Sequence, residues 1–142
     1  MTAKELMTSN PACCTKDTPL QDVARMMIKH DCGEIPIVER DGATRLVGVI
    51  TDRDIVTRAV ADGKDPRSLN AAAVMSSPAV TVNERDSTDE VMRVMETHQI
   101  RRVPVVNQNG DCCGIISQAD IARRESRKET GDLVRELSTP SR

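Results

Sequence analysis

Apolar residues recur with helical spacing in two stretches of the chain, which predicts two amphipathic helices. The stretches cover 18–30 and 86–98, and Thr18-Pro19 and Asp86-Ser87 provide helix starts. The apolar faces contain Leu20, Val23, Ala24 and Met27 in the first helix, and Val91, Met92 and Met95 in the second.

Two apolar runs follow each helix and predict a β-hairpin. The runs cover 35–39 and 45–50 after the first helix, and 103–107 and 112–116 after the second. The turns between the runs contain Asp41-Gly42 and Asn109-Gly110, which are dipeptides typical of tight hairpin turns.

The remaining predicted elements follow the same order in both places. Short strands are expected at 12–15 and 79–82, ahead of the helices, and a second helix is expected to open at Thr51 and at Ser117. The residues that these second helices would bury are Ile55, Val56 and Ala59, and Ile121 and Ala122. The predicted unit is therefore β-α-β-β-α, and it occurs twice.

The two units are also similar residue by residue. "IPIVERDGATRLVGVITDRDI" returns as "VPVVNQNGDCCGIISQADI". The offset is 68 residues from Pro36 to Pro104 and, after a short deletion, 66 from Asp54 to Asp120. One such unit is too small to bury the apolar face of its own sheet, so we expect the two units to pack on each other.

The repeat divides the chain into four parts. The first copy, with the N-terminal segment, covers 1–61, and a linker covers 62–73. The second copy covers 74–124, and a charged C-terminal tail, expected to be partly helical, covers 125–142.

Composition limits the class of protein. A chain of 142 residues that is 38% hydrophobic can bury a core. No run approaches the ~18 to 20 apolar residues of a membrane span, and the N-terminus lacks the apolar segment of a signal peptide, so we expect a cytoplasmic protein without a membrane partner. The net charge of −2, with scattered basic residues and no aromatic side chains, argues against a nucleic-acid partner.

Five cysteines lie at 13, 14, 32, 112 and 113, without any C-x-x-C, which is a poor zinc pattern. Adjacent cysteines in a strand point to opposite faces, so each pair is expected to bury one thiol and leave the other at least half exposed. Buried apolar filler is the favoured interpretation, and a disulfide or a redox switch is the alternative.

The stretch "GVITDRDI" combines a helix start with candidate binding groups. Thr51 and Asp54 are close to a capping box, whereas Arg53 faces the positive end of the helix dipole. A carboxylate can accept from both hydroxyls of a ribose, and the free amides of a helix start suit a phosphate. Two interpretations stay open: a helix cap alone, or a cap that also binds a ligand.

Two copies of β-α-β-β-α, each with a "VPVV"-like strand and a G-h-h-T/S-x-x-D-h ending in which h is apolar, resemble a pair of CBS domains. This family is named after cystathionine β-synthase, and a pair is called a Bateman module. The resemblance covers residues 5–124 and rests on two motifs in register. It implies an α+β fold, in which tandem CBS repeats pack through their sheets with pseudo-twofold symmetry and leave two clefts, in a stand-alone two-CBS-domain protein.

The resemblance further implies a homodimer and an adenosine-containing ligand, such as AMP, ADP, ATP, NAD or S-adenosylmethionine, with no catalytic cofactor. In the family, the Thr or Ser and the Asp of the motif hold the ribose and nearby phosphate, and the preceding strand encloses the base. Carried onto this chain, the ligand-binding residues are Thr51, Asp54, Ile35 and Pro36, and Ser117, Asp120, Val103 and Pro104.

The two clefts are expected to differ. Arg53 would be a phosphate partner in the first, whereas the second has Gln118 and Ala119 in place of Asp52 and Arg53. A phosphate there would depend on Ser117, the helix amides, and Arg101 or Arg102. We therefore expect the Arg53 cleft to favour the more phosphorylated ligand.

The leading hypothesis is a regulatory module that senses an adenosine-containing nucleotide and alters contact with a regulated protein. The sequence shows no nucleophile with a base, no metal cluster and no paired catalytic acids, so an enzyme is not expected. The alternatives are a dimerisation or interaction module that needs no ligand, and a cysteine-based redox sensor.

Overall fold

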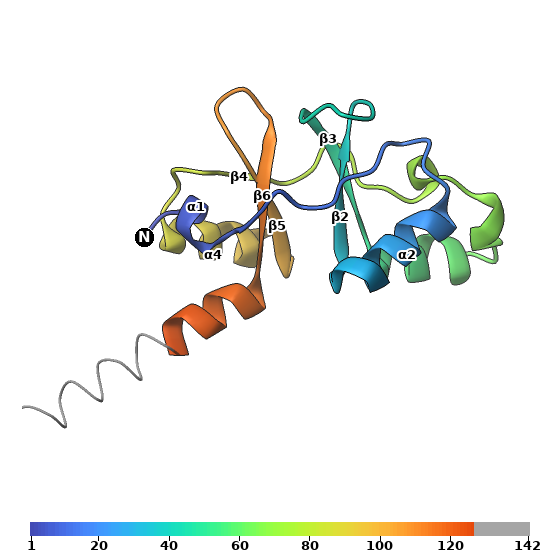
Figure 1. The fold of residues 1–142 in the computed structure, drawn as a ribbon. Coiled ribbons are helices and arrows are strands. Elements are labelled where there is room, and N and C mark those ends of the chain that lie inside the picture. The colour runs from blue at the N-terminus through green and yellow to red at the C-terminus, as the bar shows by residue number, and fades with distance from the viewer. Residues whose placement is uncertain (127–142) are drawn as a thin grey trace, which may run out of the picture.

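A computed structural model of the chain describes residues 1–126. The chain forms two halves that lie side by side, with strands toward the centre and helices on the outside (Figure 1). This mixed arrangement of helices and strands confirms the α+β class. The predicted tail lies outside the described residues from 127 onward.

The first half is built around a two-stranded antiparallel sheet in which Pro36 faces Val49. The turn between these strands contains Gly42, whose φ of 79° lies in the left-handed region that favours glycine. The elements of the first half are α2 (Leu20–His30), β2 (Glu34–Val38), β3 (Leu46–Thr51), α3 (Asp52–Ile55) and the π-helical turn η1 (Val56–Val60), followed by two short 3₁₀ turns, η2 (Pro66–Ser68) and η3 (Ala71–Ala73).

The second half contains a four-stranded sheet with the order β1-β6-β5-β4. The β4 strand runs parallel to β5, and the other pairs are antiparallel. The elements of the second half are α1 (Ala3–Leu6), β1 (Thr8–Ser9), β4 (Val82–Asn83), α4 (Thr88–His98), β5 (Arg102–Val106) and β6 (Cys112–Ser117). Residues 118–126 continue as a helix.

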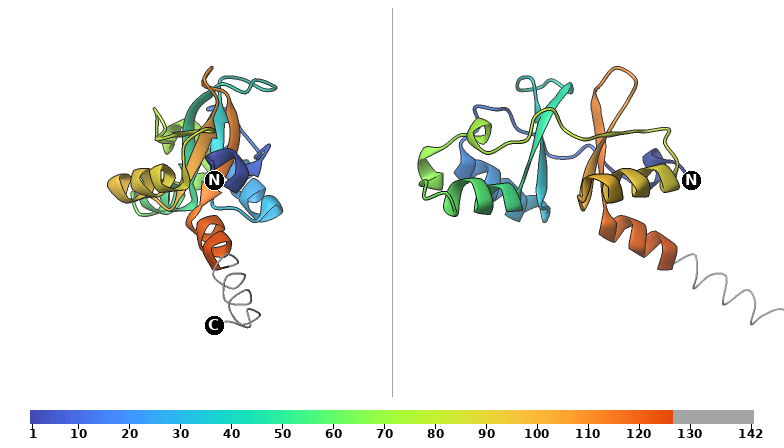
Figure 2. Two further views of the ribbon diagram at one scale, coloured as in Figure 1. Left: turned by 90° about the vertical axis from the view of Figure 1, so that its left-hand side faces the viewer. Right: turned by 180° about the vertical axis from the view of Figure 1, so that it is seen from behind.

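The two halves exchange chain segments. Although α1 and β1 stand at the start of the first copy, they belong to the second half, where Thr8 pairs with Ile115. In return, the start of the second copy runs along β3, and the backbones of Ser76 and Val49 bond to each other over N–O distances of 2.9 and 3.0 Å. Both crossing segments can be followed in Figures 1 and 2.

The motif glycines make this exchange possible. A Cβ on Gly48 would lie 2.7 Å from the carbonyl oxygen of Ser76, and a Cβ on Gly114 would collide with the side chain of Met7. Each glycine therefore stands where a crossing segment passes too close for any side chain.

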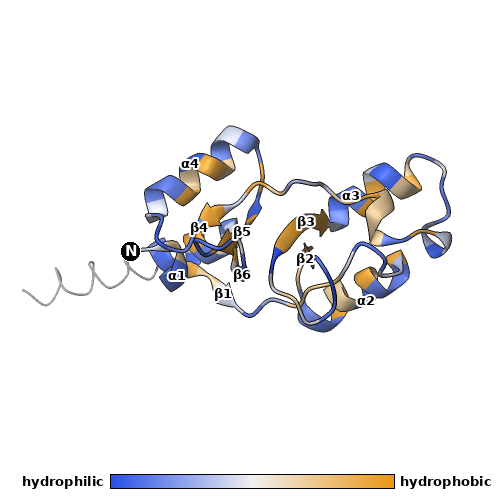
Figure 3. Ribbon diagram, turned by 90° about the horizontal axis from the view of Figure 1, so that it is seen from above, coloured by the Kyte–Doolittle hydropathy of each residue, from blue (hydrophilic) through white to orange (hydrophobic). Residues whose placement is uncertain are grey.

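Each half has its own apolar core, and the strands at the centre of the molecule are its most hydrophobic elements (Figure 3). Ile35 and Ile50 are fully buried in the first half, as Val103 and Ile116 are in the second. Burial of one such side chain contributes about 1.5 to 3 kcal/mol, so these pairs hold each sheet against its helices.

The helices α2 and α4 confirm the predicted amphipathic segments. Ser87 caps α4 by accepting a bond from the amide of Glu90 over 3.2 Å. Both helices end at the predicted histidines, and Asp31 and Gln99, which follow them, have the left-handed conformation of a helix C-cap.

Three expectations about buried side chains are wrong. Val56 is 57% exposed, because the π-helical turn directs it to solvent, whereas Ala59 is buried as expected. Ala122 is exposed, because the helix after β6 runs away from the second half and Ile121 contacts the core. Cys112 and Cys113 are both half-buried, because one face of β6 packs on the core of the second half and the opposite face lies toward the first half.

The predicted first strands are also displaced. The strand expected at 12–15 is reduced to one bridge between Cys14 and Ile37, and the chain pairs earlier, at β1. The strand expected at 79–82 begins only at its last residue, where Val82 pairs with Val105. Among the residues that the structure describes, none of the helices has both the length and the apolar character that crossing a membrane requires.

Candidate ligand-binding site

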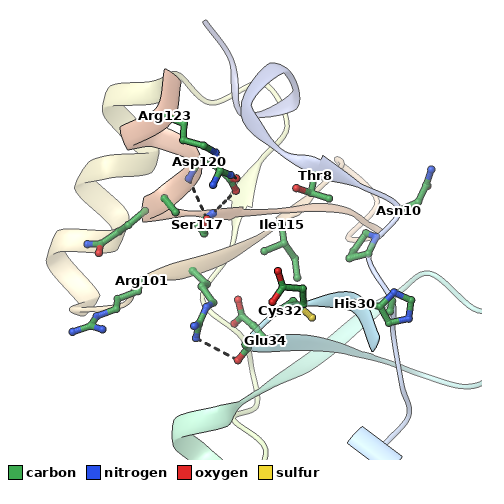
Figure 4. Close-up of a pocket in the computed structure, with 17 residues that line it drawn as sticks. Thr8, Asn10, His30, Cys32, Glu34, Arg101, Ile115, Ser117, Asp120 and Arg123 are labelled. Carbon is green, nitrogen blue, oxygen red and sulfur yellow. Dashed lines mark hydrogen bonds and ion pairs between the residues drawn. The ribbon is translucent and has the colours of Figure 1, made fainter. Parts of the chain in front are cut away.

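A cavity of about 680 Å³ opens between the two halves, which is a volume suited to a small organic ligand. Figure 4 shows Ser117, Asp120 and Arg123 on one wall, with Cys32 and Glu34 facing them. Four segments line the cavity: Thr8 with Asn10, Pro11 and Ala12; His30, Asp31, Cys32, Gly33 and Glu34; Arg101 and Arg102; and Ile115, Ser117, Gln118, Ala119, Asp120 and Arg123.

Ser117 and Asp120 form a complete capping box at the edge of this cavity. The Asp120 amide donates to Ser117 Oγ over 3.2 Å, and the Ser117 amide donates to Asp120 Oδ2 over 2.9 Å. The other carboxylate oxygen of Asp120 forms an ion pair with Arg123. Asp120 is thus fixed in place by the helix start, and one of its oxygens faces a cation of the cavity wall.

Thr51 and Asp54 repeat this geometry in the first half. Both hydrogen bonds of the box measure 3.0 Å, and Asp54 Oδ1 lies 3.9 Å from Nε of Arg58. None of these residues lines the cavity of about 680 Å³, and neither does Arg53, which is exposed. The two motifs therefore share the same local hydrogen bonds, but only Ser117 and Asp120 line this cavity.

Arg102 connects the halves at the base of the cavity. Its Nη1 atom donates to the carbonyl oxygen of Gly33 and to Oδ1 of Asp52, each over 3.3 Å. A Cβ on Gly33 would collide with this guanidinium group. The ion pair is partly exposed and contributes at most about 1 kcal/mol, so its main effect is to position Arg102.

Glu34 is a buried acid in the wall of the same cavity. The residue is 4% exposed, and its Oε2 atom has no hydrogen-bond partner among residues 1–126. Burial raises the pKa of Glu34 to about 7, and Asp54 and Asp52 add to the rise while Arg102 opposes it. The carboxyl group therefore changes its charge near neutral pH.

Charged groups of both signs line the cavity: the acids are Asp31, Glu34 and Asp120, and the cations are Arg101, Arg102 and Arg123. Arg102 and Arg123 are already paired, whereas Arg101 forms no ion pair with any described residue. Within residues 1–126 there is no group of three or more His, Cys, Asp or Glu side chains that could hold a metal ion.

The structure distributes the predicted site residues unequally. The cavity brings together Ser117, Asp120, Arg101 and Arg102. The four strand residues predicted to enclose a base are less than 2% exposed and do not line it: Ile35, Pro36, Val103 and Pro104.

The sequence interpretation missed two parts of the cavity. Glu34 stands 68 residues before Arg102, the same offset that separates Pro36 from Pro104, so a comparison of the two copies would have found it. The segment 8–12 gave no such signal, because the repeat does not show that the N-terminus crosses to the second half.

Comparison with known proteins agrees with this architecture. The family model described as "CBS domain" matches residues 3–61 and 71–127. Hypoxic response protein 1 of Mycobacterium tuberculosis is 35% identical over 139 residues, which cover 98% of this chain and 95% of that protein. Its crystal structure, with two coordinated zinc ions, has a TM-score of 0.76 at 38% identity and covers 87% of this chain and 98% of that one.

Two solved structures carry adenosine-containing ligands. The CBS domain pair of protein MJ0100, in complex with 5′-methylthioadenosine and S-adenosyl-L-methionine, has a TM-score of 0.80 at 29% identity and covers 90% of this chain and 98% of that one. A CBS domain protein of Pyrobaculum aerophilum complexed with AMP has a TM-score of 0.77 at 32% identity and covers 84% of this chain and 89% of that one. The present chain therefore belongs to the CBS domain family, and its two matched stretches form a CBS domain pair.

Proposed function

We propose that this chain is a regulatory module that binds an adenosine-containing ligand in the cavity between its halves. One observation carries the proposal: the motif residues Ser117 and Asp120 open directly on a cavity of about 680 Å³ to which both halves contribute. Solved relatives that hold AMP, or S-adenosylmethionine with methylthioadenosine, support the ligand class. The candidates are AMP, ADP, ATP, NAD and S-adenosylmethionine.

The ligand would use the groups that the cavity already presents. Asp120 accepts hydrogen bonds from the ribose hydroxyls, while Ser117, the helix amides and Arg101 suit a phosphate. Arg123 shares the carboxylate of Asp120 with the ribose or turns toward the phosphate. Thr51, Arg53 and Asp54 form the corresponding second site in this proposal.

A ligand in this cavity contacts both halves at once, so its binding can change how the two halves are positioned relative to each other. The lining includes 30–34 from the first half and 115–123 from the second. A ligand that fits one relative position of the halves better than another shifts the population toward that position. A regulated protein that contacts both halves would sense the shift.

The proposed assembly is a homodimer. Three large apolar side chains on the helices of the first half are exposed: Ile28 is 82% exposed, and Val56 and Val60 are each 57% exposed. Val56 and Val60 share one helical turn, and exposed apolar groups that gather on a helix are candidates for a surface that a second copy covers.

Calorimetric titration with the five candidate ligands tests the proposal. The Asp120→Asn variant should weaken binding about tenfold or more, because a hydrogen bond to a charged group contributes about 1.5 to 3 kcal/mol. Asp62→Asn, which changes an exposed acid of the linker, is the matched control.

The same titration separates the competing hypothesis. If Asp120 is only a helix cap, Asp120→Asn should lower the melting temperature and leave ligand affinity unchanged. An interaction module without a ligand would bind none of the five compounds in the wild-type protein, and that result would refute the proposed function.

A further inference from the structure

Glu34 and Arg102 occupy equivalent positions of the two repeats. Each is the first residue of its strand, β2 or β5, and the offset between them is 68 residues, as it is between Pro36 and Pro104. The internal symmetry therefore brings an acid from one copy and a base from the other to the same cavity.

The two groups do not neutralise each other directly. Arg102 donates to Asp52 and to the carbonyl oxygen of Gly33, while Oε2 of Glu34 has no hydrogen-bond partner among the described residues. Glu34 is also 4% exposed, so water compensates its charge poorly. An acid without a hydrogen-bond partner is thus buried in the wall of a cavity whose lining also includes Arg101, a cation without an ion pair to any described residue.

The charged and titratable groups around Glu34 come from every neighbouring element. They are Arg102 of β5, Asp52 and Asp54 of α3, His30 at the end of α2, Asp31 and Cys32 of the turn before β2, and, across the cavity, Arg101, Asp120 and Arg123. The two acids of α3 favour the neutral form of Glu34, and Arg102 favours the ionised form.

We propose that Glu34 determines which ligand charge this cavity accepts: the ionised carboxylate disfavours a phosphate group, and protonation of Glu34 removes that discrimination. The proposal rests on the proposed function and assigns a specificity residue to the same cavity. Two negative charges in one cavity repel, and water screens the buried Glu34 poorly, so the phosphate and the ionised Glu34 disfavour each other.

The position of the carboxyl pKa places this competition near neutrality. Burial raises the pKa of Glu34 to about 7 without a ligand, and a bound anion raises it further. The affinity for an anionic ligand should therefore fall as the pH rises through this range, whereas the affinity for a neutral ligand should stay level.

Two adenosine compounds of fixed charge test the proposal in the intact chain. Adenosine is neutral, and the 5′-monomethyl phosphate ester of AMP carries one negative charge throughout the range. The affinity ratio of ester to adenosine in wild-type protein should fall about fivefold or more between about pH 6 and about pH 8. Binding that Asp120→Asn removes is assigned to this cavity.

The Glu34→Gln variant should keep the shape of the side chain and abolish this pH dependence. Its ester-to-adenosine ratio near pH 8 should rise to the wild-type ratio near pH 6. Glu39→Gln is the matched control, because Glu39 lies just beyond β2 but is exposed and does not line the cavity.

Each outcome decides the inference. A wild-type ratio that is the same at both pH values overturns the role of Glu34 and leaves the proposed function standing, and this measurement needs no variant. A pH dependence that persists in a folded Glu34→Gln variant also overturns it. If the wild-type protein binds neither compound, nor any of the five candidate ligands, the proposed function and this inference fail together.

Discussion

A buried carboxyl group without a hydrogen-bond partner costs free energy whenever it is ionised. Glu34 is such a group, and because it lines the cavity, the proposed effect of its charge on binding is accompanied by an effect on stability. Because burial raises the pKa of Glu34 to about 7, the folded protein holds this proton more tightly than the unfolded chain does.

Stability should therefore decrease as the pH rises from the ordinary glutamate pKa to about 7, and the loss should be complete above that. Glu34→Gln should remove this component and make the protein more stable than wild type near pH 8, by up to about 3 kcal/mol. Urea unfolding followed by far-ultraviolet circular dichroism measures the difference. Parallel stability curves for the two proteins across this pH range would contradict the expectation.

The two capping boxes show which site residues a sequence can predict. Thr51 with Asp54, and Ser117 with Asp120, are bonded within one helical turn, so their geometry depends on local spacing alone. The role of Glu34 depends instead on where Arg102 of the other copy lies, which the spacing of residues along the chain does not encode.

The helices and strands also differ in how far the local sequence predicts them. The helices α2 and α4 and both hairpins follow from periodicity and turn dipeptides, which act over a few residues. The short strand β1 depends on its pairing with β6 and has little apolar pattern of its own. The π-helical turn after α3 also escaped prediction, because regular helical periodicity assigns Val56 to the buried face.

The motif glycines give a test at the level of elements. Gly48→Ala should destabilise the protein by about 1 to 3 kcal/mol, because the new Cβ meets the backbone carbonyl of Ser76 and the crossing segment must shift. Gly114→Ala should cost less, because its Cβ meets mainly Sδ and Cγ of Met7, which can move, and the Met7 Cβ at 2.9 Å needs only a small shift. Chemical denaturation measures the loss of stability in both variants. A loss in Gly114→Ala that equals or exceeds that in Gly48→Ala would refute the role given to the Ser76 carbonyl.

At the scale of the whole molecule, the exposed side chains Ile28, Val56 and Val60 lie on the helices of the first half, outside the sheets. The cavity is formed between the halves and is lined by other residues. The proposed dimer surface and the proposed ligand site are therefore separate, so a change of one should leave the other function measurable.

The double variant Val56→Lys/Val60→Lys should convert the proposed dimer into a monomer, because two charges would replace apolar groups in the interface. Light scattering coupled to size-exclusion chromatography gives the mass. Ala72→Lys/Ala73→Lys adds the same charge at exposed linker positions and should leave the dimer intact. A variant with Val56 and Val60 replaced that stays dimeric would exclude this surface as the interface.

The exchange of segments between the halves also determines the order of events during synthesis. The partner of β1 is β6, which leaves the ribosome last among the described strands, whereas the first half has all of its strands once Ser76 has emerged. Leu6 and Met7 are consequently synthesised long before most of the core residues that they contact. In the meantime these residues can meet the β6 strand of another copy, so this architecture allows a dimer with swapped N-terminal segments as an assembly error.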